Sequence, residues 1–487
     1  MAALSNRRVR LFSDLLLHDM GGSAGSLPRA IGLRSGRAPR LPERALASAA
    51  LFPTAGLHQR SSALTRFSMT PEATRSAEDR MVTTQATATT PDDAWGGCNP
   101  LDPAFRADPY PGLARLRERD PVNRTPIGIW RLTRYADVIR LLHAVPAGVR
   151  MTDGVLPGVD ESLSNQRLFM LQQDPPTHTR LRRLVSRAFT PRAIAALRAN
   201  VQRIVDECLE RVAARGEMDV IADLALPVPS TVICEMLGVP VADRERFTVW
   251  TAQATFGLAA PLLPPEVIEM ARAAGMSLGA YFEDLIAAHR ANLSDDLLSE
   301  LIRAEEAGDR LSGSELLSQA IGLLIAGFET TIGLIGNGVR ALVRHPAELA
   351  KLRAQPGLVA STIEECLRYD GPIVLTARVL HADAEFRGTM IPRNAMVWGM
   401  LAAANRDPAV FPEPDRFDIA RHPNEHLAFG GGAHYCLGSH LARLEGQIAI
   451  GTLVERFADL ALESETVEWG ASLFRVPGRL PLRFRPR

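Results

Sequence analysis

The sequence predicts a mainly α-helical fold with a minor β-sheet region, an α+β chain built around one long central helix. Three observations lead to this prediction. Residues 314–344 form a proline-free and mostly apolar stretch. Residues 191–215 carry apolar side chains at the spacing of one helix face. Short strand-like pieces between Ala384 and Val397 are separated by turn residues. The helical stretches dominate, and we find no internal repeat.

The first 95 residues differ in composition from the rest of the chain. Residues 1–68 hold ten Arg, no Lys and three acidic residues, a balance of +7. Such a segment carries too little apolar surface to offset its ordering entropy. We expect residues 1–95 to be a disordered extension, or to reflect a start assigned too early, with Met69 or Met81 as alternatives. The Arg-rich, acid-poor composition also leaves a targeting role open.

Residues 96–487 are predicted to form a single large domain. Its most distinct element is the helix over 314–344. Ser312 and Glu315 make a capping box at the front of this helix, and Pro346 stops it. Because the stretch is apolar on most sides near its middle, we expect it in the centre of the domain. A further proline-free helix is expected from Leu437 to about Phe457.

Composition and charge exclude several classes of protein. Apolar residues make up 46% and charged residues 23%, as in soluble globular proteins. The formal net charge is zero, so the chain after residue 68 has a balance of −7, which gives no electrostatic reason to bind nucleic acid. No uncharged apolar run approaches the roughly 18–20 residues that a membrane span needs.

The cysteines predict neither a disulfide framework nor a zinc site. Their number is odd, no CxxC pair occurs, and a reducing, cytoplasmic setting fits this pattern. The five are Cys98, Cys208, Cys234, Cys366 and Cys436.

The strongest local signal is the segment Phe429-Gly-Gly-Gly-Ala-His-Tyr-Cys-Leu-Gly438. Its glycines let the backbone approach a flat ligand and adopt positive φ. Backbone N–H groups and the start of the following helix favour a thiolate at Cys436. A thiolate is the ligand that a haem iron needs for O–O cleavage. A buried structural cysteine is the alternative for a cysteine beside glycines.

The pattern Phe-x-x-Gly-x-x-x-Cys-x-Gly resembles the signature of the cytochrome P450 family, in its soluble bacterial branch. The resemblance covers about Asn99 to Arg487. It implies a single haem domain with haem b, whose iron is bound by the Cys436 thiolate, with Phe429 and Gly438 in the cofactor loop.

The resemblance also assigns roles within the long helix, in Ala326-Gly-Phe-Glu-Thr-Thr331. An acid and a hydroxyl in an apolar helix are costly unless they have partners or a function. Gly327 weakens the helix and allows a local bulge. By resemblance, O₂ and haem lie against Ala326, Thr330 hydrogen-bonds the oxygen, and Glu329 relays protons from solvent. A polar pair that ties the helix to a neighbour is the alternative.

Two further motifs fit the family. Glu365 and Arg368, three residues apart on a helix, would join Arg416 of a Pro-x-Arg-Phe segment in a structural cluster. The resemblance also implies four side chains that hold the haem propionates, where buried carboxylates need partners. These four are His178, Arg182, Arg378 and His434.

The sequence therefore predicts a monooxygenase that inserts one atom of O₂ into a small, mainly hydrophobic organic substrate. With no flavin or nicotinamide domain attached, electrons would come from a ferredoxin and its reductase, with NAD(P)H as the ultimate donor. A peroxide-driven peroxygenase and a non-enzymatic haem-binding protein are the alternatives. From the sign of their charges alone, Arg443 and Arg187 are expected to contact an acidic ferredoxin.

Substrate identity is not predicted beyond a hydrophobic small molecule. By resemblance the pocket draws on residues 156–169 and 256–263 and on several single side chains. These are Leu323, Ala326, Val374 and Leu375, with Gln253 and Thr255 nearby.

Overall fold

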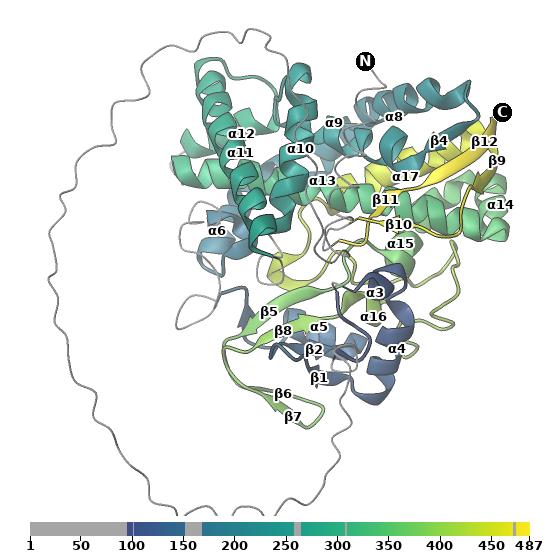
Figure 1. Cartoon of the computed structure of the whole chain (residues 1–487). Coiled ribbons are helices and arrows are strands. Elements are labelled where there is room, and N and C mark those ends of the chain that lie inside the picture. The colour runs from purple at the N-terminus through teal and green to yellow at the C-terminus, as the bar shows by residue number, and fades with distance from the viewer. Residues whose placement is uncertain (1–94, 101, 151–167, 258–263, 307–308, 471–473) are drawn as a thin grey trace, which may run out of the picture. The chain divides into compact units, whose positions relative to one another are not determined.

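Helix α13, Gly313–Arg344, lies in the middle of the helical part of the molecule (Figure 1). The computed structural model describes residues 95–100, 102–150, 168–257, 264–306, 309–470 and 474–487. The expectation for residues 1–95 therefore lies outside the described residues, apart from Trp95.

The helical part contains most of the helices between residues 177 and 456. They are α6 (Thr177–Ser186), α7 (Pro191–Ala196), α8 (Arg198–Ala213), α9 (Pro227–Met236), α10 (Arg244–Thr255), α11 (Pro265–Ala291), α12 (Leu297–Glu306), α13, α14 (Pro346–Ala354), α15 (Val359–Asp370) and α17 (Ser439–Arg456). Short turns link them: η3 (Met170–Gln172), η4 (Arg187–Phe189), η5 (Ile221–Ala225), η6 (Val241–Asp243), η8 (Pro356–Leu358) and η9 (Gly432–His434).

The sheet part holds a five-stranded sheet in the order β1-β2-β8-β5-β3. Its strands are β1 (Val122–Arg124), β2 (Trp130–Leu132), β3 (Ala147–Gly148), β5 (Thr376–Leu380) and β8 (Met396–Gly399). Near this sheet lie the helices α3 (Pro103–Ala107), α4 (Tyr110–Arg119), α5 (Tyr135–His143) and α16 (Leu401–Ala404) (Figure 1). All pairs in the sheet are antiparallel except β2 with β8.

Three smaller sheets complete the described β structure. They are the hairpin β6 (Ala384–Phe386) with β7 (Thr389–Ile391), the pair β10 (Glu468–Trp469) with β11 (Pro477–Arg479), and the three-stranded sheet β4 (Glu217–Asp219), β12 (Pro481–Pro486) and β9 (Phe457–Leu462). The expected turn residues are in place, because Arg387, Gly388 and Asn394 all have positive φ.

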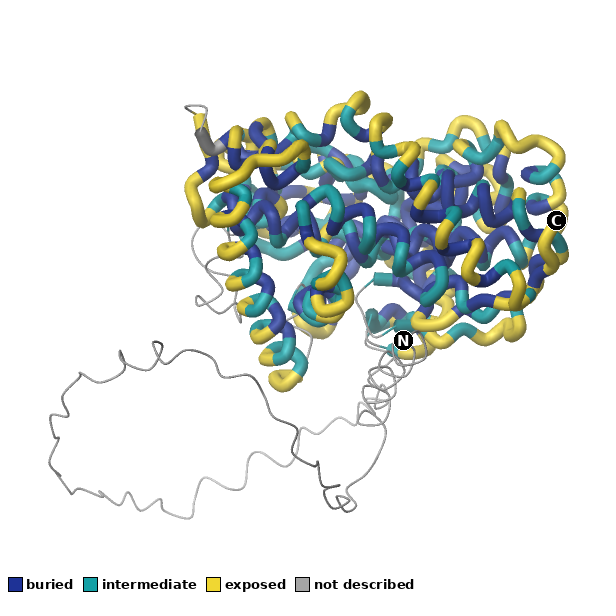
Figure 2. Tube along the Cα trace, turned by 90° about the horizontal axis from the view of Figure 1, so that it is seen from above, coloured by how far each residue is buried: buried dark blue, intermediate teal, exposed yellow. Residues whose placement is uncertain are grey.

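The long helix forms as its sequence predicts. Ser312 and Glu315 make the reciprocal capping box, and the helix ends at Arg344, just before Pro346. By length and composition α13 is the one described helix apolar enough to cross a membrane, but 67% of that apolar window is buried inside the domain, as in the core helix of a soluble protein. Figure 2 shows the buried residues gathered in the interior and the exposed ones at the periphery.

Two local predictions are wrong. The expected helix over 191–215 is divided into α7 and α8, because Leu197 N–H bonds to the Ile194 carbonyl in a tighter turn. The expected bulge at Gly327 is absent, since α13 is α-helical from end to end. Instead the Thr330 hydroxyl donates to the Ala326 carbonyl at 2.9 Å, which uses an acceptor of the helix without breaking it.

Candidate active site

The cysteine loop is shaped by backbone hydrogen bonds and by glycines. Cys436 N–H donates to the Phe429 carbonyl at 3.0 Å, which closes the loop on itself. Gly430 and Gly432 have φ of 70° and 65°, values that other residues rarely adopt. A Cβ on Gly432 would also collide with the Leu142 carbonyl of α5. The loop therefore requires these glycines, as the sequence indicated.

Cys436 stands out from the other cysteines. All five lie in the described residues, four are buried, and Cys436 is half-buried. Burial raises the pKa of its thiol. The Gly438 N–H, which bonds to the sulfur, and the charges of Arg182 and Arg443 lower this pKa but do not cancel the effect of burial. The Gly438 N–H therefore acts in the predicted direction, toward the thiolate, while burial acts against it. A cation beside the sulfur would favour the thiolate further.

A second group of side chains gathers near the loop. The rings of His178 and His434 lie with centroids 4.2 Å apart, although the residues come from α6 and η9. His178 Nδ1 and His434 Nε2 are buried and have no hydrogen-bond partner among the described residues. Burial, Arg378 and His178 lower the pKa of His434 to about 4, so its ring is neutral at pH 7.

Arg378 and Arg182 complete this group. Arg378 is 7% exposed and donates to two neutral acceptors, the Thr376 hydroxyl at 3.1 Å and the Ala377 carbonyl at 2.8 Å. Arg182 donates to the Tyr435 carbonyl at 2.7 Å, which ties α6 to the cysteine loop. A buried guanidinium whose hydrogen bonds go to neutral acceptors, beside two imidazole nitrogens without hydrogen-bond partners among the described residues, favours an anionic group at this place.

One face of α13 borders open space. Ala326 is exposed although Phe328 and Ile332 of the same helix are buried. Thr330 follows Ala326 by four residues and is half-buried, so the two share this face. A Cβ on Gly327 would meet just one atom within 4 Å, Ile233 Cδ1 at 3.7 Å. Glu329, also half-buried, stands next to Thr330.

The side chains expected around the substrate are placed unevenly. Leu323 is 6% exposed, while Val374, Leu375 and Gln253 are half-buried. Thr255 is 3% exposed and its hydroxyl donates to the Thr251 carbonyl, so it offers a substrate no free polar group. Of the two expected loop segments, residues 156–167 and 258–263 lie outside the described residues.

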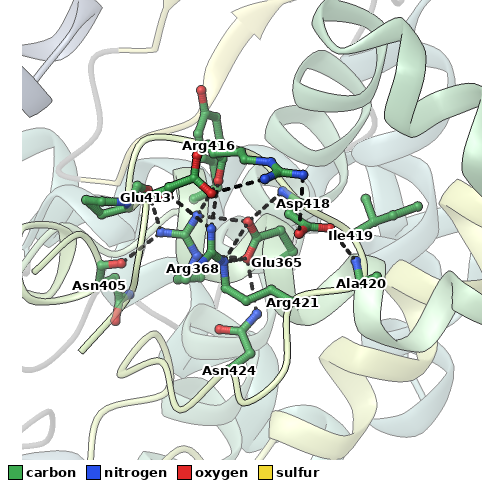
Figure 3. Close-up of polar contacts among 12 residues, drawn as sticks. Glu365, Arg368, Asn405, Glu413, Arg416, Asp418, Ile419, Ala420, Arg421 and Asn424 are labelled. Atoms are coloured by element: carbon green, nitrogen blue, oxygen red, sulfur yellow. Dashed lines mark hydrogen bonds and ion pairs between the residues drawn. The ribbon is translucent and has the colours of Figure 1, made fainter. Parts of the chain in front are cut away.

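The pair Glu365–Arg368 is fully buried and forms two hydrogen bonds of 2.8 Å (Figure 3). The arginine that joins it was assigned wrongly. Arg416 contributes its carbonyl to Arg368, while its guanidinium is 56% exposed and pairs with Glu413. The third side chain is Arg421, whose Nε lies 3.3 Å from the Glu365 carboxylate. Arg421 lies five residues after Arg416 and outside the Pro-x-Arg-Phe segment, so the motif did not identify it.

The sequence did not predict a second cluster of charged side chains, which adjoins Phe429 of the cysteine loop. Arg443 binds Glu364 through two hydrogen bonds of 2.8 Å, and its guanidinium lies 4.4 Å from the centre of the Phe429 ring. Burial raises the pKa of Glu364, but hydrogen bonds from His426 and Arg443 outweigh it and bring the pKa to about 2. Arg443 is therefore engaged in an ion pair with Glu364. The two residues lie 79 positions apart, so no local spacing in the sequence predicts the pair.

Comparison with known proteins identifies the family. The family model described as Cytochrome P450 matches residues 151–468. Cytochrome P450 107B1 of Saccharopolyspora erythraea is 41% identical over 403 residues, which covers 79% of this chain and 96% of that protein. The chain belongs to the cytochrome P450 family. The cytochrome P450 monooxygenase PikC of Streptomyces venezuelae is 42% identical over 392 residues, 78% of this chain and 92% of that protein.

The fold agrees with this assignment. The myxobacterial cytochrome P450 CYP267B1, solved in complex with myristic acid, aligns with a TM-score of 0.74 and 40% identity, over 79% of this chain and 98% of that chain. The mainly α fold with minor β-sheets is therefore confirmed. As a cytochrome P450, the protein is a monooxygenase whose cofactor is haem b with an axial cysteine thiolate.

The residues around the loop fit such a cofactor. A haem brings two propionate carboxylates, which would satisfy the orphaned nitrogens of His178 and His434 and the charge of Arg378. It would also bring an iron cation, whose charge favours the thiolate form of Cys436. No group of three or more His, Cys, Asp or Glu suited to a metal ion occurs in the described part of the chain.

Proposed function

We propose that this protein is a cytoplasmic monooxygenase for a small, mainly hydrophobic organic substrate, supplied with electrons by a ferredoxin and its reductase, with NAD(P)H as the ultimate donor. The observation that carries the proposal is the half-buried Cys436 in a glycine loop, with the Gly438 N–H on its sulfur. The haem domain is taken to span residues 96–487, with residues 1–95 outside it.

The overall reaction is R–H + O₂ + 2 e⁻ + 2 H⁺ → R–OH + H₂O. Haem, when bound, supplies the activation of O₂. Cys436 would hold the iron within the loop that begins at Phe429 and ends at Gly438. His178, Arg182, Arg378 and His434 would hold the propionates, since their nitrogen atoms gather beside this loop and His178 and Arg378 are buried.

The open face of α13 supplies the proton chemistry. Ala326 leaves room for O₂ because it has no side chain beyond Cβ and is exposed. Thr330 Oγ1 donates its one proton to the Ala326 carbonyl and keeps lone pairs that can accept a hydrogen bond, so it passes a proton on when its hydroxyl rotates away from that carbonyl and accepts another in exchange. Glu329 takes protons from solvent and delivers them toward Thr330.

The electron donor is proposed to dock on an arginine-rich surface. From residue 177 to residue 205 the chain has seven Arg and no acidic residue. Arg187, Arg192 and Arg198 are exposed and form no ion pair within the described residues. They lie on η4, α7 and α8, and α7 packs against α17, which follows the cysteine loop. Charge complementarity favours an acidic partner at this surface. Arg443, bound to Glu364, is left out of it.

The proposed substrate class rests on the side chains that the resemblance to the family assigns to the pocket. Leu323, Val374 and Leu375 are apolar, and Thr255 keeps its hydroxyl within its own helix. The relative CYP267B1 was solved with myristic acid, which is an apolar chain with one polar end. We therefore place the substrate among apolar molecules with few polar groups.

The first experiment is the absorption spectrum of the reduced protein with carbon monoxide. A strongly red-shifted Soret band establishes thiolate ligation and supports the proposal. A band typical of histidine ligation, or no haem band in protein expressed with haem, contradicts it.

A second experiment separates the oxygenase from the alternatives. Thr330→Ala is expected to consume electrons without forming product, and Thr330→Ser to restore coupling. Efficient turnover with peroxide alone would favour the peroxygenase. Unchanged electron use in Thr330→Ala would favour a haem protein without oxygenase activity. Arg187→Glu with Arg192→Glu should slow reduction by ferredoxin but leave chemical reduction by dithionite unchanged.

A further inference from the structure

The side chain of Asp174 joins the start of α6 to the end of strand β3. Its carboxylate accepts the Val149 N–H at 2.9 Å and the Arg150 N–H at 3.0 Å, and both residues directly follow β3. Its backbone carbonyl accepts the His178 N–H at 3.0 Å in the first turn of α6. One residue therefore fixes the edge of the five-stranded sheet to the helix that carries His178 and Arg182.

Gly148 makes room for this carboxylate. A Cβ built on Gly148 would come closer to the carboxylate atoms of Asp174 than real Cβ atoms come to any neighbour. Gly148 belongs to β3 and its φ lies outside the left-handed region, so the contact with the carboxylate, and not conformational freedom, accounts for the glycine. Gly148 pairs with Val379 of β5, and Arg378 is the neighbouring residue of that strand. The carboxylate thus lies against the strand that is paired with the strand of Arg378.

The charge of Asp174 also acts on the group that we assign to the propionates. Burial lowers the pKa of His178, Arg378 and His434, and the negative charge of Asp174 raises all three. Asp174 therefore lies within electrostatic reach of the whole group. An acidic side chain is thus held beside the place where two further carboxylates would bind, although like charges repel.

No guanidinium or ammonium group offsets this charge directly. In the described part of the chain no Arg or Lys forms an ion pair with Asp174, whose side chain is 17% exposed. The His381 ring lies 3.8 Å from Oδ2, but its Nε2 forms a hydrogen bond with the Arg150 carbonyl at 3.0 Å. The backbone N–H groups that bind the carboxylate leave its net charge in place. The field of Asp174 therefore extends to its surroundings.

We propose that Asp174 is a positioning residue for the haem group. Its carboxylate holds β3, and through β5 also Arg378, against α6. Its negative charge lowers the reduction potential of the iron, because the ferric state carries one more positive charge than the ferrous state. The inference rests on the proposed function, since it takes the group around His178 and Arg378 as the place of the propionates.

The role of the charge is tested by the midpoint potential of the haem-loaded protein without substrate, measured by redox titration of its absorption spectrum. Asp174→Asn removes the charge and keeps the size and one acceptor oxygen. It should shift the ferric–ferrous equilibrium roughly tenfold toward the ferrous form, a rise of about 59 mV for a one-electron couple. Asp174→Glu keeps the charge and should leave the potential nearly unchanged.

Asp219→Asn is the matched control for the potential. The Asp219 carboxylate also accepts backbone N–H groups, those of Ile221 at 3.1 Å and Leu480 at 3.0 Å, but Asp219 belongs to β4 of the separate three-stranded sheet. This variant loses the same charge and the same kind of hydrogen bond elsewhere in the protein. It should therefore leave the potential unchanged.

The positioning role is tested by the rate at which haem passes from the protein to apomyoglobin. Gly148→Ala should speed this transfer several-fold, because its methyl group displaces the carboxylate while the charge remains. On the Asp174→Ala background the methyl group has no carboxylate to displace, so Gly148→Ala should add little.

An unchanged potential in Asp174→Asn, or an equal rise in Asp219→Asn, overturns the role of the charge. A transfer rate that Gly148→Ala leaves unchanged, or raises equally on the Asp174→Ala background, overturns the positioning role. If Asp174→Asn fails to bind haem, the transfer rate of Gly148→Ala still decides that role. A reduced carbon monoxide spectrum without the red-shifted band contradicts the proposed function, whereas a red-shifted band with an unchanged potential in Asp174→Asn contradicts this inference alone.

Discussion

The cysteine side and the α13 side of the site differ in how firmly they are built. Around Cys436 the backbone closes on itself, two glycines have positive φ, and Arg182 holds the loop from α6. The face of α13 carries Ala326 and Thr330, whose hydroxyl donates to the Ala326 carbonyl of the same helix. On this face the Phe169 ring also lies against Gly322. The cysteine side is therefore specified by many local constraints, whereas the α13 side, where we propose that substrate binds, is specified by a few packing contacts.

The comparison shows where variation is tolerated. Changes on the cysteine side disturb several hydrogen bonds at once and should act on cofactor binding or on stability. If the proposed function is correct, changes on the α13 face should alter the size of the ligand that is accepted and the transfer of protons, with little effect on the fold. The following predictions test this division, from the largest effect to the smallest.

The largest effect is expected for Cys436→Ala. Since Cys436 is the half-buried cysteine of the loop, its removal should abolish the red-shifted band of the reduced carbon monoxide complex completely. Cys234→Ala serves as a matched control, because Cys234 is buried and distant in sequence. A red-shifted band that survives in Cys436→Ala would assign the ligand elsewhere.

Glu365→Ala should destabilise the protein by about 3–5 kcal/mol, because it leaves the buried charge of Arg368 unpaired. Denaturation by urea, followed by far-UV circular dichroism, measures the change. The exposed pair Arg272–Glu269 is the control, and Arg272→Ala should cost less than about 1 kcal/mol. Equal losses in the two variants would show that the buried cluster has no special role.

Glu445 links the two sides, since this buried residue of α17 hydrogen-bonds Thr331 of α13. Burial raises its pKa to about 8, against the effect of Thr331. The folded protein therefore binds a proton that the unfolded chain releases, and stability should fall as pH rises from about 4.5 to 8. Glu445→Gln should remove a decline of roughly 1–4 kcal/mol in urea denaturation. Parallel pH profiles in the two proteins would contradict this.

The smallest effect is expected for deletion of residues 1–95. If the haem domain spans 96–487, the shortened chain should bind haem and unfold at the same urea concentration as the full chain. A lost carbon monoxide band or a lower unfolding midpoint would place part of the domain before residue 96.

The sequence predicted those parts of the fold that depend on neighbours along the chain. The capping box of Ser312 and Glu315 and the turn at Arg387-Gly388 act over two to four residues, and both are confirmed. The break at Leu197 was missed because neither glycine nor proline marks it. Arg421 was missed because its approach to Glu365 depends on the path of the loop between them.

In the site, too, the features that depend on neighbouring residues were predicted and those that depend on distant residues were not. The glycines of the cysteine loop are required by the local backbone, so the sequence pattern predicts them. The grouping of His178, His434 and Arg378 brings together α6, η9 and β5, and likeness to a family predicted it where spacing alone does not. The ring of Phe169 lies against Gly322 of α13, and Gln319 of the same helix hydrogen-bonds the residues on either side of Phe169. The sequence did not predict these contacts, because they join residues about 150 positions apart.

The position of Gly432 under α5 has a consequence for how the protein is assembled. α5 packs with the five-stranded sheet, while Arg182 approaches the same loop from the helical part. The loop thus acquires its shape when both parts have come together and neither part forms it alone. We therefore expect haem to bind after the two parts have packed together, so that a chain with one part misassembled would lack the cofactor and could not reduce O₂ without forming product.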